Sequence, residues 1–467
     1  MKLKLFIAIL FVLFAKIDFA QNVKISGTEL SYANQELVLL TYSEHITFSE
    51  NALAKSLVKE DGSYLFEFST ENAISVFMYI GRYKAFLLVE PNRDYKIFLP
   101  EFSEKSTSEK LNPYFKDMEI TLEILSSKKN ELNNIISEFD STFNAVLNKN
   151  FPSIYRQRKY SIIDSIVQLI DTQFINIENK YLNSHKLYKY SSLYYMANQR
   201  NSEFIIEKYF SENPVLYHHT EYMNMFNQIF ARYLTFYSLT KNGNRIPLDI
   251  SLTKSVVRLK HTLSNNPNLK NDTLKELIIL KGIYDNFYLG NYSQKTLLLI
   301  IDSIGATTKV AHHKLIVENI KKNVNCLKIG TKAPEFELYN RNKRKKKLSN
   351  FSGKFIYLNF ANTENYACQK DFQLLANLYK KHGKTIEIVT IISNGTHEDM
   401  TEFLEGKDYD WTFLHCGNQP TVIKDYKIKV YPLYFLVDPY GKLALSPALP
   451  PHENFEIQLF KEIKKRD

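Results

Sequence analysis

Residues 348–372 read LSNFSGKFIYLNFANTENYACQKDF, and this stretch decides the fold of the C-terminal third of the chain. A Gly-Lys turn is followed by an apolar run that ends at Ala361. Apolar runs of this length, bounded by turn residues, are typical of buried strands. A helical pattern then continues to Lys381, with a single cysteine, Cys368, close to its start. We therefore expect a buried strand followed by a helix that carries one thiol near its start.

Further segments on both sides of this stretch have recognisable patterns. Ile329–Leu338 reads IGTKAPEFEL and precedes a strongly basic run at residues 340–347, which we interpret as a solvated surface segment rather than a polyanion site. Downstream, Glu387–Ser393 has the pattern of a second buried strand, and Trp411 follows it. Tyr426–Lys442 reads YKIKVYPLYFLVDPYGK, in which a proline separates two runs rich in β-branched and aromatic residues.

In this order, the segments resemble the TlpA/ResA family of thioredoxin-like redoxins, which are related to the AhpC/TSA proteins. The resemblance covers about 140 of the 467 residues and includes the motifs G-x-x-A-P-x-F-x-L and L-S-x-x-x-G-K. It implies an α/β thioredoxin fold for residues 326–467, closed by a helix at Phe455–Lys464. It also implies that Pro432, preceded by Tyr431, is a cis-proline whose loop binds an extended peptide substrate.

The resemblance also defines a candidate active site, which this chain retains only in part. In the family, the helix begins with W-C-x-x-C, and the first thiolate attacks a disulfide that the second thiol resolves. Cys368 matches the second, resolving position, whereas Asn365 stands at the nucleophile and Glu364 replaces the tryptophan. A dithiol cycle requires both sulfur atoms, because an attacking thiol without a partner stalls as a mixed disulfide.

The chain has three cysteines, Cys326, Cys368 and Cys416, which cannot all pair with one another. At the resolving position Cys368 would be partly buried, and burial makes a thiol less reactive. Cys416 or Cys326 is a possible second thiol for Cys368, and the sequence leaves this open. A peroxidase-type site is disfavoured, because the nearest upstream threonine, Thr363, lies five residues before Cys368 and not three.

Two functions are consistent with these residues. The first is a non-catalytic, thioredoxin-like envelope protein that has lost dithiol activity and binds a peptide or protein partner beside Tyr431 and Pro432. The alternative is a divergent thiol-disulfide oxidoreductase that works through Cys368, with Cys416 as a possible helper. Neither function requires a cofactor or a metal, and the chain is classed as an enzyme in the second case only.

The N-terminus predicts export from the cytoplasm. Residues 1–20 combine two early lysines, an apolar run at Leu5–Ala15 and a final alanine, which is the layout of a signal peptide. No later stretch has the roughly 20 apolar residues that a membrane helix needs. We expect a periplasmic or cell-envelope protein without a transmembrane segment once residues 1–20 are removed.

Between the signal peptide and the C-terminal domain, the pattern indicates two further domains. Residues 21–102 contain short alternating strands, such as Tyr64–Phe68 after an Asp-Gly turn, and predict a small antiparallel β-sandwich. Residues 103–325 predict an all-α region, because apolar residues recur at helical spacing in 135–147, 162–181, 273–284 and 293–304. The expected fold is therefore multidomain.

The net charge and the histidine pairs do not indicate a nucleic-acid partner or a metal site. Removal of residues 1–20 takes away three lysines and one aspartate, so the net charge falls from +10 to +8. Without a patterned basic face, this mild excess does not indicate a nucleic-acid partner. The pairs His218–His219 and His312–His313 do not predict a metal site, because adjacent helical side chains diverge. Tyrosines near residue 190 are interpreted as helix-packing residues.

Overall fold

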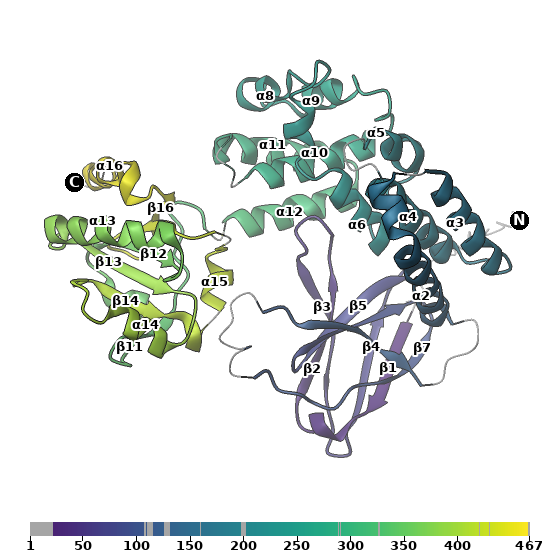
Figure 1. The fold of residues 1–467 in the computed structure, drawn as a ribbon, viewed down its shortest axis with the longest axis horizontal. Coiled ribbons are helices and arrows are strands. Elements are labelled where there is room, and N and C mark those ends of the chain that lie inside the picture. Colours follow the sequence, from purple (N-terminus) through teal and green to yellow (C-terminus); the bar gives the residue numbers. More distant parts are fainter. Residues whose placement is uncertain are drawn as a thin grey trace, which may run out of the picture.

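The computed structural model describes residues 22–465, apart from 107–108, 110–114, 126–130, 159, 198–201, 288, 290, 326, 420 and 429. The expected signal peptide and Cys326 lie outside the described residues. The described chain forms a sandwich of two sheets, then a helical region, then a domain built on a single larger sheet (Figure 1). Within this part of the chain no helix is long and apolar enough to cross a membrane.

The N-terminal sandwich has one sheet in the order β4-β1-β7-β9 and another in the order β3-β2-β5-β6-β8. In β4, Tyr64 and Phe66 face the core between the sheets and alternate with exposed residues, as the period-two pattern predicts. Gly62 adopts φ +79° in the turn before β4, where an added Cβ would lie 2.8 Å from the backbone of Glu29. The first strands are β1 (Asn22–Thr28), β2 (Glu36–Tyr42), β3 (Glu50–Leu57) and β4 (Ser63–Ser69), followed by β5 (Ile74–Ile80), β6 (Tyr83–Val89) and β7 (Asp94–Phe98).

Two features of the sandwich differ from the prediction. Its sheets are mixed, because β1 pairs in parallel with β7, and β6 pairs in parallel with β8. The strands β8 (Met118–Thr121) and β9 (Glu123–Ile124) also lie beyond residue 102, in the stretch assigned to the helical region. Both are short and largely exposed, so they complete the sheet edges through backbone hydrogen bonds and carry no alternating apolar pattern.

Helices predominate from residue 132 to residue 325 and share one large apolar core. The helices expected at 273–284 and 293–304 are confirmed as α10 and α11. The stripe at 162–181 does not form a single helix, because α3 ends at Gln173 and α4 begins at Lys180; both bury their apolar faces in the same core. The helices are α2 (Leu132–Phe151), α3 (Tyr160–Gln173), α4 (Lys180–Ala197), α5 (Glu203–Ile205), α6 (Thr220–Ile229), α7 (Tyr233–Tyr237), α8 (Ile246–Leu248), α9 (Val256–Leu263), α10 (Asp272–Asn286), α11 (Gln294–Thr307) and α12 (Ala311–Asn325).

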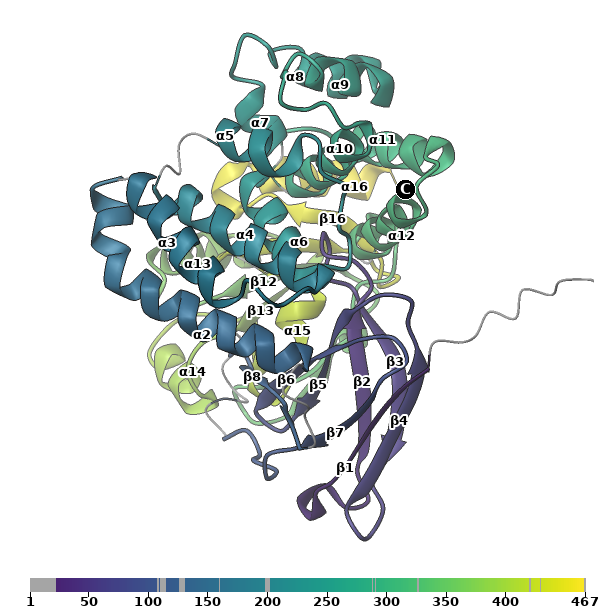
Figure 2. The same cartoon turned by 90° about the vertical axis from the view of Figure 1, so that its right-hand side faces the viewer.

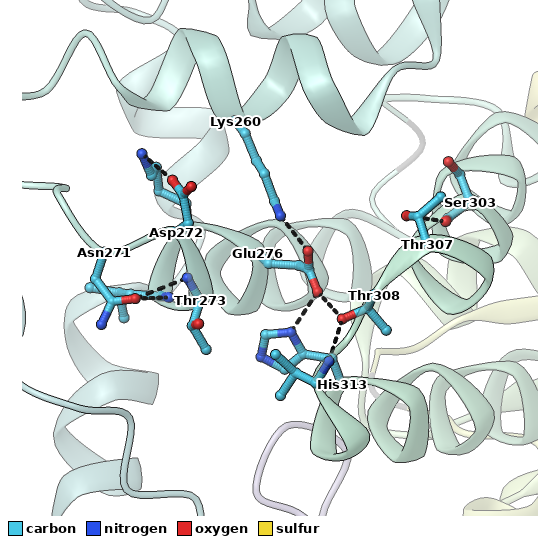
Figure 3. Close-up of polar contacts among 12 residues, drawn as sticks. Lys260, Asn271, Asp272, Thr273, Glu276, Ser303, Thr307, Thr308 and His313 are labelled. Atoms are coloured by element: carbon cyan, nitrogen blue, oxygen red, sulfur yellow. Dashed lines mark hydrogen bonds and ion pairs between the residues drawn. The ribbon is translucent and has the colours of Figure 1, made fainter.

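A buried polar network joins three of these helices around Glu276 (Figure 3). His313 Nδ1 lies 2.7 Å from Glu276 Oε1, and the Thr308 hydroxyl and the Lys260 ammonium also contact this carboxylate. His313 is fully buried, and its Nε2 lies 2.8 Å from the Tyr217 hydroxyl. The neighbouring His312 stacks on the Tyr217 ring, so both histidines contact this tyrosine. In the described part of the chain, no group of three or more His, Cys, Asp or Glu residues has the geometry of a metal site.

The β2–β3 loop joins the sandwich to the helical region, and Figure 1 shows it extending toward α12. Ile46 in this loop is 4% exposed and belongs to the core of the helical region, not to that of the sandwich. Asn227 of α6 donates to the His45 carbonyl at 2.6 Å, and Asn319 of α12 donates to the Ser43 hydroxyl at 2.9 Å. The loop thus inserts an apolar side chain between helices and holds it there with hydrogen bonds on both sides.

The C-terminal domain has a mixed sheet in the order β11-β10-β14-β13-β12-β15-β16. β12 and β13 are parallel, whereas β15 is antiparallel to β12 and to β16, which is the thioredoxin arrangement. Successive residues of β12 alternate between two apolar clusters, one on each face of the sheet. The strands are β10 (Glu337–Asn340), β11 (Lys345–Lys347), β12 (Phe355–Ala361), β13 (Ile386–Ile392), β14 (Thr412–His415), β15 (Leu433–Val437) and β16 (Leu443–Ala448), and the helices are α13 (Tyr366–His382), α14 (His397–Leu404), α15 (Thr421–Asp425) and α16 (Phe455–Lys464).

Candidate functional site

The site lies where the central strand β12 gives way to α13. Every residue of β12 is buried, and the chain turns at residues 362–365 before the helix begins at Tyr366. Asn365 is the N-cap, and its side-chain oxygen accepts hydrogen bonds from the backbone N–H groups of Ala367 at 2.9 Å and Cys368 at 3.3 Å. Asparagine is a favoured N-cap because its side chain satisfies donors that the first turn leaves unpaired. Asn365 therefore stabilises the start of the helix that carries the thiol.

Cys368 lies in the first turn of α13 and is fully buried. The backbone N–H of Asn362 lies 3.5 Å from its sulfur atom. Burial raises the pKa of the Cys368 thiol to about 11, and the nearby Asp371 carboxylate acts in the same direction. The effect of burial exceeds that of the Asn362 N–H, which acts to lower this pKa. At neutral pH Cys368 is consequently a protonated thiol and a weak nucleophile.

Behind the thiol lies a buried polar cluster that the sequence analysis missed. The Asp371 carboxylate accepts a hydrogen bond from the Tyr434 hydroxyl at 2.8 Å and lies 2.9 Å from His452 Nδ1. Asp371 and Tyr434 are each 2% exposed, whereas His452 is half-exposed. Asp371 follows Cys368 by three residues on one helix face, which is a usable sequence signal. His452 lies 81 residues further along the chain, and no local pattern connects it to the site.

The proline loop lies beside the same end of β12. The Tyr431–Pro432 peptide bond is cis, as the family resemblance implies. Leu433, the first residue of β15, pairs with Phe360, so the loop is next to the residues that lead from β12 into α13. Tyr431 is half-buried and packs against the apolar clusters on both faces of the sheet. The structure thus brings the loop and Cys368 into one neighbourhood.

Cys416 does not share this neighbourhood. It follows β14, is fully buried and belongs to the apolar cluster on the opposite face of the sheet from Cys368. Burial raises the pKa of the Cys416 thiol to about 12, and both cysteines are free thiols. The two thiols thus belong to different apolar clusters, on opposite faces of the sheet.

The basic run forms the turn of the β10–β11 hairpin at the edge of the sheet. Its central residues 341–345 are exposed to solvent. Lys345 and Lys347 both form ion pairs with Glu337 on the neighbouring strand, at 2.7 and 3.4 Å. Lysines on an edge strand also discourage pairing with another chain. The hairpin tip is therefore solvated, as expected.

Comparisons with known proteins match the C-terminal domain to a redoxin family. Residues 329–446 match the model of the AhpC/TSA family. The chain is 31% identical over 119 residues to the thiol-disulfide oxidoreductase ResA of Bacillus thuringiensis subsp. konkukian, which covers 25% of this chain and 68% of that protein. ResA of Bacillus subtilis strain 168 is 32% identical over 118 residues, covering 25% of this chain and 64% of ResA.

Among solved structures, similar chains include a putative thiol:disulfide interchange protein DsbE from Chlorobium tepidum. It has 25% sequence identity and a TM-score of 0.27, and the match covers 29% of this chain and 98% of that one. The fold and the position of the site define a thioredoxin-like redoxin domain at the C-terminus. Through this domain, the chain belongs to the family of ResA-like redoxins.

Proposed function

We propose that this protein is an exported, thioredoxin-like binding protein of the cell envelope that has lost the dithiol redox cycle. The observation that carries the proposal is the first turn of α13, where an asparagine caps the helix and the one thiol is fully buried. Export is supported by the signal-peptide layout of residues 1–20. The family membership supports a peptide or protein partner as the ligand of the C-terminal domain.

The chemistry of the thiol supports the loss of redox activity. At a pKa of about 11, a thiolate fraction of about one in ten thousand is present at pH 7. An attacking sulfur would in any case need a second thiol, and Cys416 lies on the other face of the sheet. Asn365 has no sulfur, yet it conserves the helix start by capping it. The turn before α13 thus retains its conformation but lacks the nucleophilic thiol of the family motif.

The surface around the proline loop supports the binding role. Tyr366, the first residue of α13, is 80% exposed, and Val430, just before the cis-proline, is 62% exposed. These side chains flank the turn where a thioredoxin-like protein meets an extended peptide, and exposed aromatic residues are common anchors of such contacts. Neither side chain is part of an apolar core, so both are free to contact a ligand.

A matched pair of tyrosines tests the binding role. Tyr366 and Tyr440 are 80% and 79% exposed, but Tyr440 lies beyond the opposite end of β15 from Pro432. We expect Tyr366→Asp to weaken binding of a fluorescein-labelled, cysteine-free unfolded polypeptide by about tenfold, because it places a charge in an apolar contact. Tyr440→Asp should leave the affinity unchanged. Equal affinities for both variants and the parent protein would contradict the proposed binding site.

The second candidate, a single-cysteine thiol-disulfide oxidoreductase, is favoured by the names of the relatives. It requires that Cys368 react with disulfides near neutral pH in the folded protein. Its burial and its raised pKa both oppose this reaction. The two candidates therefore differ in one measurable property, the reactivity of a single sulfur atom.

A further inference from the structure

A cleft of about 700 Å³ lies between the N-terminal sandwich and the helical region, far along the chain from Cys368. Its walls come from the β2–β3 loop, the sheet edge at β6 and β8, and the helices α2, α4 and α6. Figure 2 shows α2 running alongside this edge of the sandwich. Clefts of this size between structural units are common ligand sites.

Aromatic side chains form part of the cleft wall. Tyr42, Phe48 and Phe86 line it from the sandwich, and Tyr181 lines it from α4. The faces of such rings attract cations. One cation already uses this aromatic cluster, because the Lys84 ammonium lies 4.5 Å from the centre of the Tyr42 ring and 5.3 Å from that of Phe86.

The charged groups that line the cleft are carboxylates. Glu119, Asp140 and Glu221 line it, and none of the described lining residues is lysine or arginine, although the chain has 60 basic and 50 acidic residues. Lys189 approaches from outside the lining, 3.5 Å from Asp140 and 3.4 Å from Glu221. These distances exceed that of a tight charge-assisted hydrogen bond, and the side chains of Asp140 and Glu221 are 30% and 22% exposed.

One of the two histidines of the lining contacts a carboxylate. His185 Nε2 lies 2.8 Å from Asp140 Oδ1, the same oxygen atom that Lys189 approaches. Burial lowers the pKa of His45 to about 4, so this ring is uncharged at neutral pH. The cleft therefore combines aromatic rings with partly exposed carboxylates.

We propose that this cleft binds an organic cation, an ammonium or a guanidinium group, through Glu119, Glu221 and Asp140 and the surrounding rings. The cation belongs either to a small free amine or to a lysine or arginine side chain of a peptide. The site is independent of the thioredoxin-like site and would remain if the function proposed for that site were wrong.

Calorimetric titration of the full chain at low salt tests this proposal. Spermidine serves as the free amine, and the blocked tripeptides acetyl-Ala-Lys-Ala-amide and acetyl-Ala-Arg-Ala-amide serve as peptide cations. We expect saturable binding of at least one of these probes, weakening as salt rises, and no binding of acetyl-Ala-Glu-Ala-amide. Whichever kind of cation binds more tightly identifies the source.

Charge-removing variants then locate the site. Glu119→Gln and Glu221→Gln should each lower the affinity for the tightest-binding probe by about tenfold, because each removes a charge-assisted contact. Glu138→Gln is the matched control, since Glu138 lies on α2 close to Asp140 but is exposed and outside the cleft lining. Binding of none of the three cations, equal binding of the glutamate peptide, or an equal loss in Glu138→Gln would overturn the proposal.

Discussion

Asn365 and Cys368 show how far single residues reveal the site. The resemblance to the family motif placed both at the start of a helix, and in the structure Asn365 is the N-cap and Cys368 lies in the first turn. Burial of the thiol also followed from its inner position in the motif. The sequence could not reveal the contacts that cross from one segment to another, such as those of Asp371 with Tyr434 and His452. Such contacts depend on how distant segments pack, and local sequence patterns do not predict them.

Replacement of Asn365 by cysteine should rebuild a redox pair if the turn has the geometry described. In a Cys326→Ala background, we expect Asn365→Cys to form an intramolecular disulfide with Cys368 under mild oxidation, because the helix N-terminus favours a thiolate at position 365. Intact-mass analysis with and without reductant measures the bond. Asn365→Ser is the control and should form none. A reduced pair after oxidation of Asn365→Cys would show that the turn is built differently.

The acceptor at position 371 should be important for stability. Asp371→Ala leaves the buried Tyr434 hydroxyl without its partner, so we expect the free energy of unfolding to fall by about 2–3 kcal/mol. Asp371→Asn retains an acceptor oxygen and should lose less. Urea denaturation followed by circular dichroism measures both. If both variants lose the same amount, the hydrogen bond to Tyr434 does not stabilise the fold.

At the scale of elements, long apolar patterns were predicted well and short polar elements were not. α10 and α11 were recognised because their apolar residues recur over several turns. β8 and β9 were missed because they have only four and two residues, which are largely exposed and form no alternating apolar pattern. The insertion of the β2–β3 loop into the helical core could not be predicted from the sequence either, because a single isoleucine in a polar loop forms no periodic pattern.

Ile46 should couple the sandwich to the helical region. Its side chain belongs to the helical core although it comes from a sandwich loop, so Ile46→Ala should reduce the free energy of unfolding by about 2–4 kcal/mol. Leu57→Ala removes the same kind of side chain from a site on β3 that is 66% exposed, and should have little effect. Equal losses in urea denaturation would mean that the loop does not anchor the two parts.

The Glu276 network should make stability depend on acid pH. Burial acts to raise the pKa of Glu276, but contacts with His313, Lys260 and Thr308 outweigh it and lower the pKa from 4.5 to about 2. A lowered pKa in the folded state stabilises the protein above pH 4.5, and this contribution is lost as the pH falls from about 4.5 to about 2. Glu276→Gln should flatten the fall in melting temperature over this range, whereas the exposed Glu138→Gln should not. If the melting temperature of Glu276→Gln falls with pH as steeply as that of the parent protein, the ionised Glu276 does not stabilise the fold.

At the scale of the whole molecule, the order of a strand-rich part, a helical part and a thioredoxin-like domain was predictable. Each part has its own period along the chain, and the C-terminal motifs occur in the family order. The boundary near residue 102 was less well placed, since the sandwich continues to Ile124. The cleft between the first two parts was not foreseen, because its lining comes from segments that only the fold brings together.

We propose that the C-terminal domain keeps the thioredoxin fold while burial protects its thiol from reaction. The most direct measurement is the rate of iodoacetamide alkylation of the folded, Cys326→Ala chain as a function of pH, with Cys368→Ser as the control. The account predicts negligible labelling of Cys368 at pH 7, a rate that is still rising toward pH 11, and rapid labelling once the protein is unfolded. Fast labelling at pH 7 that disappears in Cys368→Ser would contradict it and would favour the single-cysteine oxidoreductase.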